Sequence, residues 1–344
     1  MKYKFMKNVG NPDDPQGMLV LMHRYLEWLR VHNYCDSTIE GRHFYIGFFI
    51  RWCEERGVVQ PAEVTKQIIE RYQRYLYHYR KKNGDPLSFR SQHGRLIPVR
   101  AWFKWLARQN YILYNPSADI ELPRLEHRLP KYVLTISEAE QVINQANVSQ
   151  RLGIRDRAIL ETLYSTGVRR SELVGLRTYD LDIERGTLIV RQGKGKKDRM
   201  IPIGERAMAW IDKYVTDVRP GLLNGDNSGD FLFLTEVGEP IRPDQLTILV
   251  RRYVDSSEVG KRGSCHLFRH TMATLMLENG ADIRYIQAML GHVKLETTAI
   301  YAQVSIRKLK EIHTATHPAR NERNGTNGKP KKKRKRKTKE GEGR

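Results

Sequence analysis

Cysteine is scarce in this sequence. The 344 residues include three cysteines, Cys35, Cys53 and Cys265, an odd number with no CxxC spacing. Disulfide frameworks need paired cysteines, and cysteine zinc sites need closely spaced ones. The sequence therefore argues against both, and it predicts a protein of a reducing compartment.

Long apolar runs are also lacking. No stretch approaches the roughly 20 apolar residues that a membrane span requires. The segment Met1 to Gly10 has no apolar core of a signal peptide, which is typical of mature cytosolic sequence. No GxxxxGK[ST] phosphate loop and no acidic metal cluster is present either, so neither a Walker-type nucleotide site nor a carboxylate metal site is expected.

Positive charge, in contrast, is abundant. The chain has 60 Lys and Arg against 39 Asp and Glu, a net charge of +21. Residues 318–344 contribute +9 of this, so the rest of the chain keeps +12. A folded body that basic points to a polyanion, with nucleic acid as the first candidate and an anionic membrane as the weaker alternative.

Helical periodicity dominates the first hundred residues. Apolar residues recur on one face from Met18 to Leu29, and Asp36-Ser37-Thr38 offers the start of a second helix that ends at Gly57. A third helix is expected over 61–82, before the turn Asn83-Gly84-Asp85-Pro86, and a fourth over 88–109. The pattern predicts an all-α four-helix bundle over 1–114. Its exposed faces carry the candidate nucleic-acid-contacting residues Arg90, Arg95, Arg100 and Lys104.

A proline-rich stretch follows this bundle. Pro116, Pro123 and Pro130 lie in an aperiodic segment, which favours an extended linker over 115–131. A second domain is expected over 132–317, with a β-hairpin whose strands, 187–190 and 199–203, flank a basic glycine-bearing tip, and with a further strand over 231–234. The lysine-rich segment 318–344 predicts a disordered basic tail that binds phosphates non-specifically, with a nuclear localisation signal as the weaker alternative. The fold class expected is mainly α with a small β-sheet (α+β).

Four residue clusters in the second domain could carry chemistry. Thr166-Gly167-Val168-Arg169 presents an arginine at a helix start, and Glu172 lies where it can orient that arginine. The hairpin tip holds Lys194 between Gly193 and Gly195. Taken alone, each is better explained as an ordinary charged surface turn or helix end.

The other two clusters contain histidine. On a helix, His266 and Arg269 are i, i+3 neighbours that can face one phosphate. His266 and His270 have the spacing of a zinc HExxH helix, but Leu267 occupies the position of its glutamate, so zinc is not favoured. Gly291 is expected to end a helix just before His292, and Tyr301 follows nine residues later.

Together these residues resemble the tyrosine recombinase (phage integrase) family, nearest to its Xer-type and mobile-element members. The resemblance extends from about Leu26 to His313 and includes TGVRRSELVGL, GKGKKDRMIPI, HLFRHTMATLMLENGADIRYIQAMLGH and TTAIYAQV. It implies a SAM-like core-binding domain followed by a catalytic domain. Arg170 departs from the family pattern, which has an apolar or small residue there.

The resemblance also implies roles for the site residues. Tyr301 would attack the scissile phosphate, Arg169 and Arg269 would hold its oxygens, and Lys194 would protonate the departing 5′-oxygen. His266 would act as a base or phosphate donor and His292 as a further hydrogen-bond donor. Lys196 and Lys197 at the hairpin tip are expected to contact DNA.

The partners implied are double-stranded DNA with recombination sites and a homotetramer formed through the segment after Tyr301. An accessory DNA-bending protein is a further candidate partner. The scheme needs no metal or nucleotide cofactor, and the expected location is the bacterial cytoplasm, associated with the nucleoid. Two other functions remain open at this point. One is a type IB topoisomerase-like enzyme that relaxes supercoils, and the other is a non-catalytic architectural DNA-binding factor, which would be expected to have lost at least one catalytic residue.

Overall fold

The chain folds into two compact units, Met1–His127 and Arg128–Arg344, each with its own hydrophobic core. A computed structural model describes residues 10–125, 132–191, 198–224 and 228–291. We call the two parts the N-terminal and C-terminal units. No helix within the described ranges is long and apolar enough to span a bilayer.

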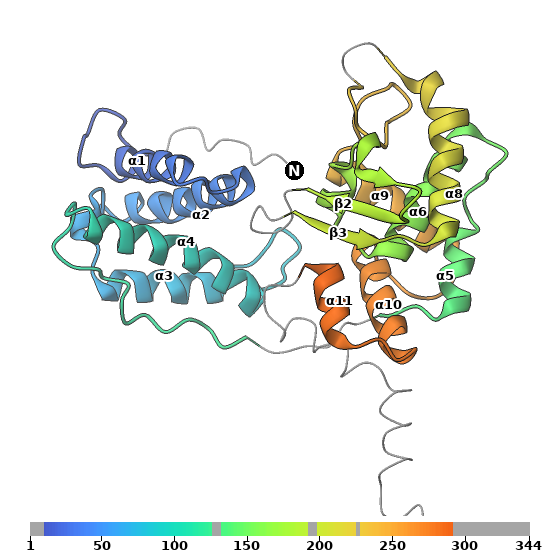
Figure 1. The fold of residues 1–344 in the computed structure, drawn as a ribbon. Coiled ribbons are helices and arrows are strands. Elements are labelled where there is room, and N and C mark those ends of the chain that lie inside the picture. Colours follow the sequence, from blue (N-terminus) through green and yellow to red (C-terminus); the bar gives the residue numbers. More distant parts are fainter. Residues whose placement is uncertain (1–9, 126–131, 192–197, 225–227, 292–344) are drawn as a thin grey trace, which may run out of the picture. The chain divides into compact units, whose positions relative to one another are not determined.

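The N-terminal unit is helical, as its periodicity predicts (Figure 1, blue to teal). The apolar face of the first helix is buried from Met18 to Leu29, against a core that also takes Phe49, Trp102 and Phe103 from later helices. Burial of these large side chains supplies the main stabilisation of the bundle. The helices are α1 (Met18–Val31), α2 (Asp36–Glu54), α3 (Lys66–His78) and α4 (Phe89–Arg108), with a short 3₁₀ turn, η1 (Pro61–Glu63).

The third helix is shorter than the predicted 61–82. Pro61–Glu63 forms a separate 3₁₀ turn, and α3 begins after Thr65, whose hydroxyl accepts a hydrogen bond from the Ile68 N–H. At the other end Tyr79 is already extended, and Arg80 forms an antiparallel bridge with Pro86 across the predicted turn. Local side-chain caps and this bridge therefore set the helix ends, which apolar spacing alone does not reveal.

The segment after α4 packs back on the N-terminal unit. Ile112, Ser117 and Ile120 are buried, and the Ser117 hydroxyl donates to the Arg100 carbonyl. The Gln73 amide donates to the Glu121 carbonyl at 3.0 Å. The first part of the expected linker, 115–131, is thus packed into this unit, and its residues 126–131 lie outside the described ranges.

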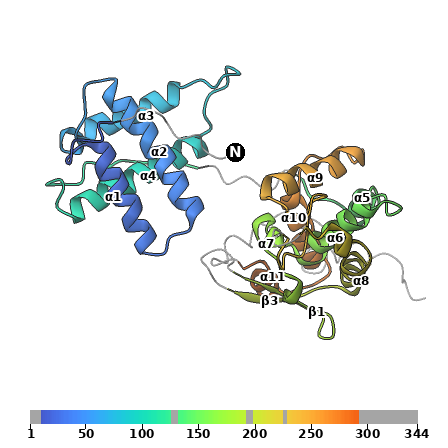
Figure 2. The same cartoon turned by 90° about the horizontal axis from the view of Figure 1, so that it is seen from above.

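The C-terminal unit packs helices against a small antiparallel sheet that lies along one side of the unit (Figures 1 and 2). The sheet has the order β1-β2-β3, and Leu188 on β2 pairs with Ile201 on β3, both buried. This confirms the predicted mainly α fold with a small sheet. The elements that lead to the sheet are α5 (Ile136–Ile143), α6 (Arg151–Thr166), α7 (Arg170–Val174) and η2 (Thr178–Asp180). The strands are β1 (Leu181–Asp182), β2 (Thr187–Val190) and β3 (Arg199–Pro202). The later elements are α8 (Glu205–Lys213), η3 (Tyr214–Val218), η4 (Arg219–Leu222), α9 (Pro243–Ser256), α10 (Cys265–Glu278) and α11 (Ile283–Leu290).

The predicted strand over 231–234 is wrong. Phe231 and Leu234 form isolated bridges with two different partners, Arg177 and Pro240, so the segment joins no ladder. Its apolar run exists because Leu232, Phe233 and Leu234 fill the core. The Arg177 guanidinium covers the Phe231 ring at 3.5 Å from its centroid. Burial, rather than pairing, explains the apolar pattern here.

We expect Gly167→Ala to destabilise the C-terminal unit by about 1–2 kcal/mol. Gly167 ends α6 with φ +59°, and an added Cβ would lie 2.3 Å from Met272 Cε. Urea unfolding measures the change. The matched control is Gly94→Ala, inside α4, where a Cβ meets nothing within 4 Å and helix propensity favours alanine. Equal stability of the Gly167 variant and the wild type would contradict the expectation.

Candidate active site

Arg169 lies between the end of α6 and the start of α7. The left-handed turn at Gly167 redirects the chain, and the Arg169 N–H donates to the Glu172 carboxylate at 2.8 Å. Its guanidinium donates to Glu172 Oε1 at 2.6 Å and to the Gly291 carbonyl at 3.1 Å. The side chain remains 19 % exposed, so it is fixed in direction yet accessible to a ligand.

Arg269 reaches the same place from α10. Its guanidinium donates to the Gly167 carbonyl at 2.6 Å and to the Leu290 carbonyl at 2.7 Å, and the residue is only 4 % exposed. Gly167 and Gly291, the left-handed C-caps of α6 and α11, therefore each offer a carbonyl oxygen to one of the two arginines. Two guanidinium groups a hundred residues apart in sequence converge where these helices end.

Glu172 also binds a third arginine, Arg199, which lies at the start of β3. Arg199 donates to both carboxylate oxygens, at 3.0 and 2.8 Å, and its Nε donates to the Met289 carbonyl at 2.8 Å. Burial by itself would raise the pKa of Glu172, but the hydrogen bonds and charges of Arg199 and Arg169 outweigh it and lower the pKa to about 2. Glu172 is therefore ionised throughout the neutral range.

His266 is exposed on the first turn of α10, one helical turn before Arg269. It borders a cavity of about 780 Å³ whose wall also includes His270 and two arginines, Arg251 and Arg262. The protein atoms around the imidazole displace part of its hydration, and this is the main effect that lowers the pKa of His266 below its usual 6.5. The positive charges of Arg269, Arg170 and Arg169 lower it further. Burial, and then the charges of His266 and Arg269, lower the pKa of His270 to about 4. His266 is thus a neutral imidazole at pH 7, able to accept a proton.

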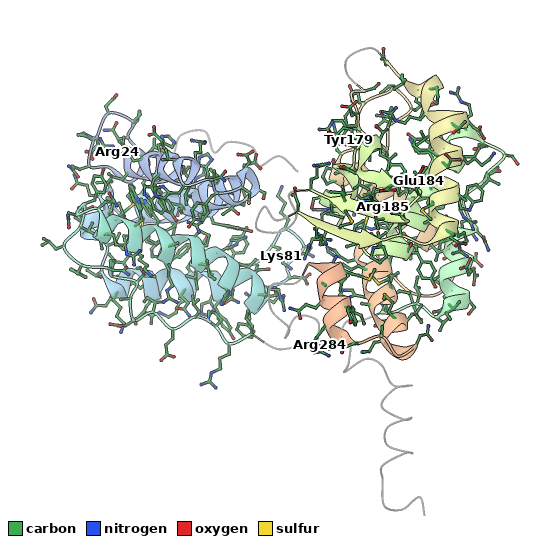
Figure 3. All side chains as sticks on the ribbon, in the orientation of Figure 1. Arg24, Lys81, Tyr179, Glu184, Arg185 and Arg284 are labelled. Atoms are coloured by element: carbon green, nitrogen blue, oxygen red, sulfur yellow. The ribbon has the colours of Figure 1, made fainter. Side chains whose placement is uncertain are left out.

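The base of the β2–β3 hairpin is anchored on both sides. On the β2 side, Arg191 donates to the buried Asp180 at 2.6 Å and lies over the exposed ring of Tyr179, which is labelled in Figure 3. On the β3 side, Arg199 is held by Glu172. The tip itself, with Lys194, Lys196 and Lys197, lies outside the described residues.

The structure thus brings together four of the predicted site residues, Arg169, Glu172, His266 and Arg269. His292 and Tyr301 lie outside the described residues, although His292 directly follows Gly291, whose carbonyl Arg169 binds. Arg199 was not predicted as a site residue. The motif GKGKKDRMIPI contains it, but its contact with Glu172, 27 positions away, depends on how β3 packs and has no local signal.

The four basic residues expected to contact DNA from α4 differ in their surroundings. Arg90 and Lys104 are exposed. Arg95 is half-buried, with its guanidinium 5.5 Å from the Phe48 ring centroid and 5.2 Å from that of Tyr79. Arg100 is also half-buried and donates to the Ala118 carbonyl at 3.5 Å. Arg90 and Lys104 therefore present the more accessible charges.

We expect the His266 imidazole of the DNA-free protein to titrate below pH 6.5, and Arg170→Ala to move that midpoint upward. Arg170 contributes one of the three positive charges that disfavour the imidazolium, and its removal leaves the loss of hydration and two charges in place. NMR titration of labelled histidine measures the midpoint, with His266→Gln to assign the signal. Arg206→Ala, on α8, serves as the control and should leave the midpoint unchanged. A wild-type midpoint at or above 6.5 would refute the expectation.

A mixed α/β unit in which two guanidinium groups and a neutral imidazole meet is suited to chemistry on a phosphodiester. Comparison with known proteins defines the class. The chain matches the Phage integrase family over residues 132–307. It is 50 % identical to "Tyrosine recombinase XerC 2" of Ralstonia nicotianae over 313 residues, 90 % of each chain. It is 36 % identical to "Tyrosine recombinase XerC" of Natranaerobius thermophilus over 291 residues, 84 % of this chain and 92 % of that one.

Solved structures support the same fold. The XerH site-specific recombinase in a post-cleavage complex with its palindromic difH substrate has a TM-score of 0.68 at 20 % identity, covering 90 % of this chain and 99 % of that chain. A lambda integrase dimer bound to a COC′ core site has a TM-score of 0.61 at 18 % identity, covering 83 % and 95 %. The chain belongs to the phage integrase family and is a tyrosine recombinase.

Proposed function

We propose that this protein cuts and rejoins double-stranded DNA at specific sites through a covalent phosphotyrosine intermediate on Tyr301. One observation carries the proposal. Arg169 and Arg269, which come from separate segments of the chain, meet at the ends of α6 and α11 beside His266. This gives a fixed cationic pocket whose planar guanidinium groups suit a phosphate.

In the proposed cleavage step, the Tyr301 phenolic oxygen attacks the scissile phosphorus. The bond from phosphorus to the 5′-oxygen breaks, which leaves a 3′-phosphotyrosine and a free 5′-hydroxyl. A phenol with an ordinary pKa near 10 is a poor nucleophile at neutral pH, so its proton must pass to an acceptor. Neutral His266 fits that role, and Lys194 donates the proton that the 5′-oxygen takes up.

The two arginines are proposed to oppose the charge that builds on the non-bridging oxygens in the transition state. Preorganised donors of this kind contribute about 3–4 kcal/mol each. His292 would add a further hydrogen bond, and Glu172 orients Arg169. Because the phosphotyrosine ester conserves the energy of the broken bond, the 5′-hydroxyl of a second duplex can reverse the step and join the strands. Strand exchange of this kind passes through a Holliday junction.

The proposed assembly is a homotetramer on two DNA sites, joined through the segment after Tyr301, with 306–312 as the docking segment. Arg90, Arg95, Arg100, Lys104, Lys196 and Lys197 are the proposed contacts to the DNA backbone. An accessory DNA-bending protein would assist the assembly, which would act in the bacterial cytoplasm on nucleoid DNA. Binding that neutralises many phosphates would weaken steeply with salt.

A suicide substrate tests this function. The full-length protein is mixed with a nicked duplex that contains its site, and the mixture is denatured and examined for a covalent DNA adduct. An adduct together with exchanged strands supports the proposal. An adduct without strand exchange would indicate a topoisomerase-like enzyme instead. DNA binding without an adduct would indicate an architectural factor.

A further inference from the structure

We propose that Arg199 is a positioning residue for strand cleavage, because its guanidinium holds both Glu172 and the end of α11 in the places that aim Arg169 at the phosphate. This inference rests on the proposed function. Arg199 would not touch DNA or the reacting atoms. It would act through the side chain of Glu172 and the backbone of α11.

The first support is that the Arg199 guanidinium binds two partners at once, the Glu172 carboxylate and the Met289 carbonyl. Both terminal nitrogens of Arg199 donate to the Glu172 carboxylate, and Nε donates to the Met289 carbonyl. The side chain is 13 % exposed and that of Glu172 is 3 % exposed. A planar fork with three directed donors fixes the angle between its partners, which a lysine ammonium does not do.

The second support is electrostatic. Glu172 Oε1 accepts from Arg169 as well as from Arg199, so one carboxylate lies between two guanidinium groups. Without Arg199, the charge of Glu172 would neutralise that of Arg169, and the attraction of Arg169 for a phosphate would be weaker. Arg199 supplies the second positive charge, so the three side chains together keep a net charge of +1. Arg199 thereby lets Glu172 orient Arg169 without cancelling its field.

The third support is the contact with the end of α11. A Cβ added to Gly291 would lie 3.2 Å from Cδ, Cζ and Nε of Arg199, so the guanidinium packs directly against this glycine. The Gly291 carbonyl in turn accepts from Arg169. Arg169 and Arg199 therefore both contact the C-terminal end of α11. His292 is the next residue in the chain. Arg199 also begins β3, the strand that follows the hairpin tip with Lys194.

The test compares Arg199→Lys with the wild type in single-turnover cleavage of two suicide substrates. One substrate has the natural scissile phosphate. The other has a methylphosphonate there, which keeps the leaving group but lacks the negative charge that Arg169 would bind. Arg206→Lys is the matched control, since Arg206 also bridges carboxylates, at 2.9 Å from Glu161 and 2.8 Å from Glu140, neither of which is a residue of the proposed site.

We expect Arg199→Lys to slow cleavage of the phosphate substrate roughly 30-fold and that of the methylphosphonate less than about 5-fold, with DNA affinity within about 2-fold of the wild type. The control should cleave both substrates at wild-type rates. The ratio of the two rates within one preparation is independent of the folded fraction, so a loss of stability does not obscure the result.

Equal slowing on both substrates would overturn the inference, because it would show a structural role only. Unchanged cleavage of the phosphate substrate would overturn it too. If the wild-type protein itself forms no adduct, the proposed function fails and this inference falls with it. Wild-type adduct with no selective defect in Arg199→Lys would refute the positioning role alone.

Discussion

Replacement of Tyr301 by phenylalanine should abolish the covalent DNA adduct, with less than about one part in 10⁴ of the wild-type cleavage rate remaining. Phenylalanine keeps the ring but removes the oxygen that would form the ester, and no second group in the pocket offers an equivalent nucleophile in the proposed scheme. The measurement is the yield of protein–DNA adduct from the suicide substrate after denaturation. DNA affinity should stay within about 2-fold, because one neutral hydroxyl adds little to binding dominated by phosphate contacts.

The matched control for this result is Tyr285→Phe. Tyr285 lies on α11, is 71 % exposed and has no role in the proposed chemistry. Its variant should form the adduct at the wild-type rate. Loss of the adduct in the Tyr285 variant, or its survival in the Tyr301 variant, would mean that the nucleophile has been assigned to the wrong tyrosine. Peptide mapping of the wild-type adduct would then identify the phenol that is esterified.

The helices were predictable where one physical signal dominates. The face from Met18 to Leu29 has the spacing of a buried stripe, and all of its apolar positions at that spacing are buried in α1. The hairpin was predictable because two β-rich runs flank glycines, and β2 does pair with β3. Patterns of this kind depend on neighbours in sequence, which are visible without the fold.

The failures have a different cause. The apolar run over 231–234 has the composition of a strand, yet its residues face the core from an irregular segment whose partners, Arg177 and Pro240, are set by tertiary packing. The early end of α3 at His78 depends on a bridge between Arg80 and Pro86. In each case contacts made only in the folded unit override the local preference.

The site shows the same division. The motif order pointed to Arg169, His266 and Arg269, and to Glu172 as the residue that orients Arg169, but not to the other groups that hold the two arginines. The carbonyl groups of Gly291 and Gly167 accept hydrogen bonds from Arg169 and Arg269. Arg199 donates to both oxygens of Glu172, the carboxylate that also binds Arg169. A glycine before a helix start suggests a turn, whereas the direction of its carbonyl depends on how α6, α10 and α11 pack. Supporting contacts therefore required the structure.

Removal of Arg269 should have the second largest effect, because this side chain serves the fold and the proposed chemistry together. We expect Arg269→Ala to lower strand cleavage by at least about 10³-fold, the loss expected for a preorganised donor to the transition state. It should also cost the C-terminal unit about 3 kcal/mol of unfolding free energy, since the Gly167 and Leu290 carbonyls lose their buried donor. Single-turnover cleavage and urea unfolding measure the two losses.

Arg269→Lys separates charge from geometry at this position. A lysine ammonium keeps the positive charge but cannot span the carbonyl oxygens of Gly167 and Leu290 while also presenting a flat donor edge to a phosphate. The cleavage rate of Arg269→Lys should therefore be about 100-fold below that of the wild type, even where the variant is folded and binds DNA. Arg284→Ala is the control, since Arg284 (Figure 3) is 80 % exposed and pairs only with Asp282 among its described contacts. Its cleavage rate should match the wild type. Cleavage by Arg269→Lys within tenfold of the wild-type rate would show that a positive charge at this position is enough for catalysis. The hydrogen bonds of the guanidinium to the Gly167 and Leu290 carbonyls would then contribute to stability only.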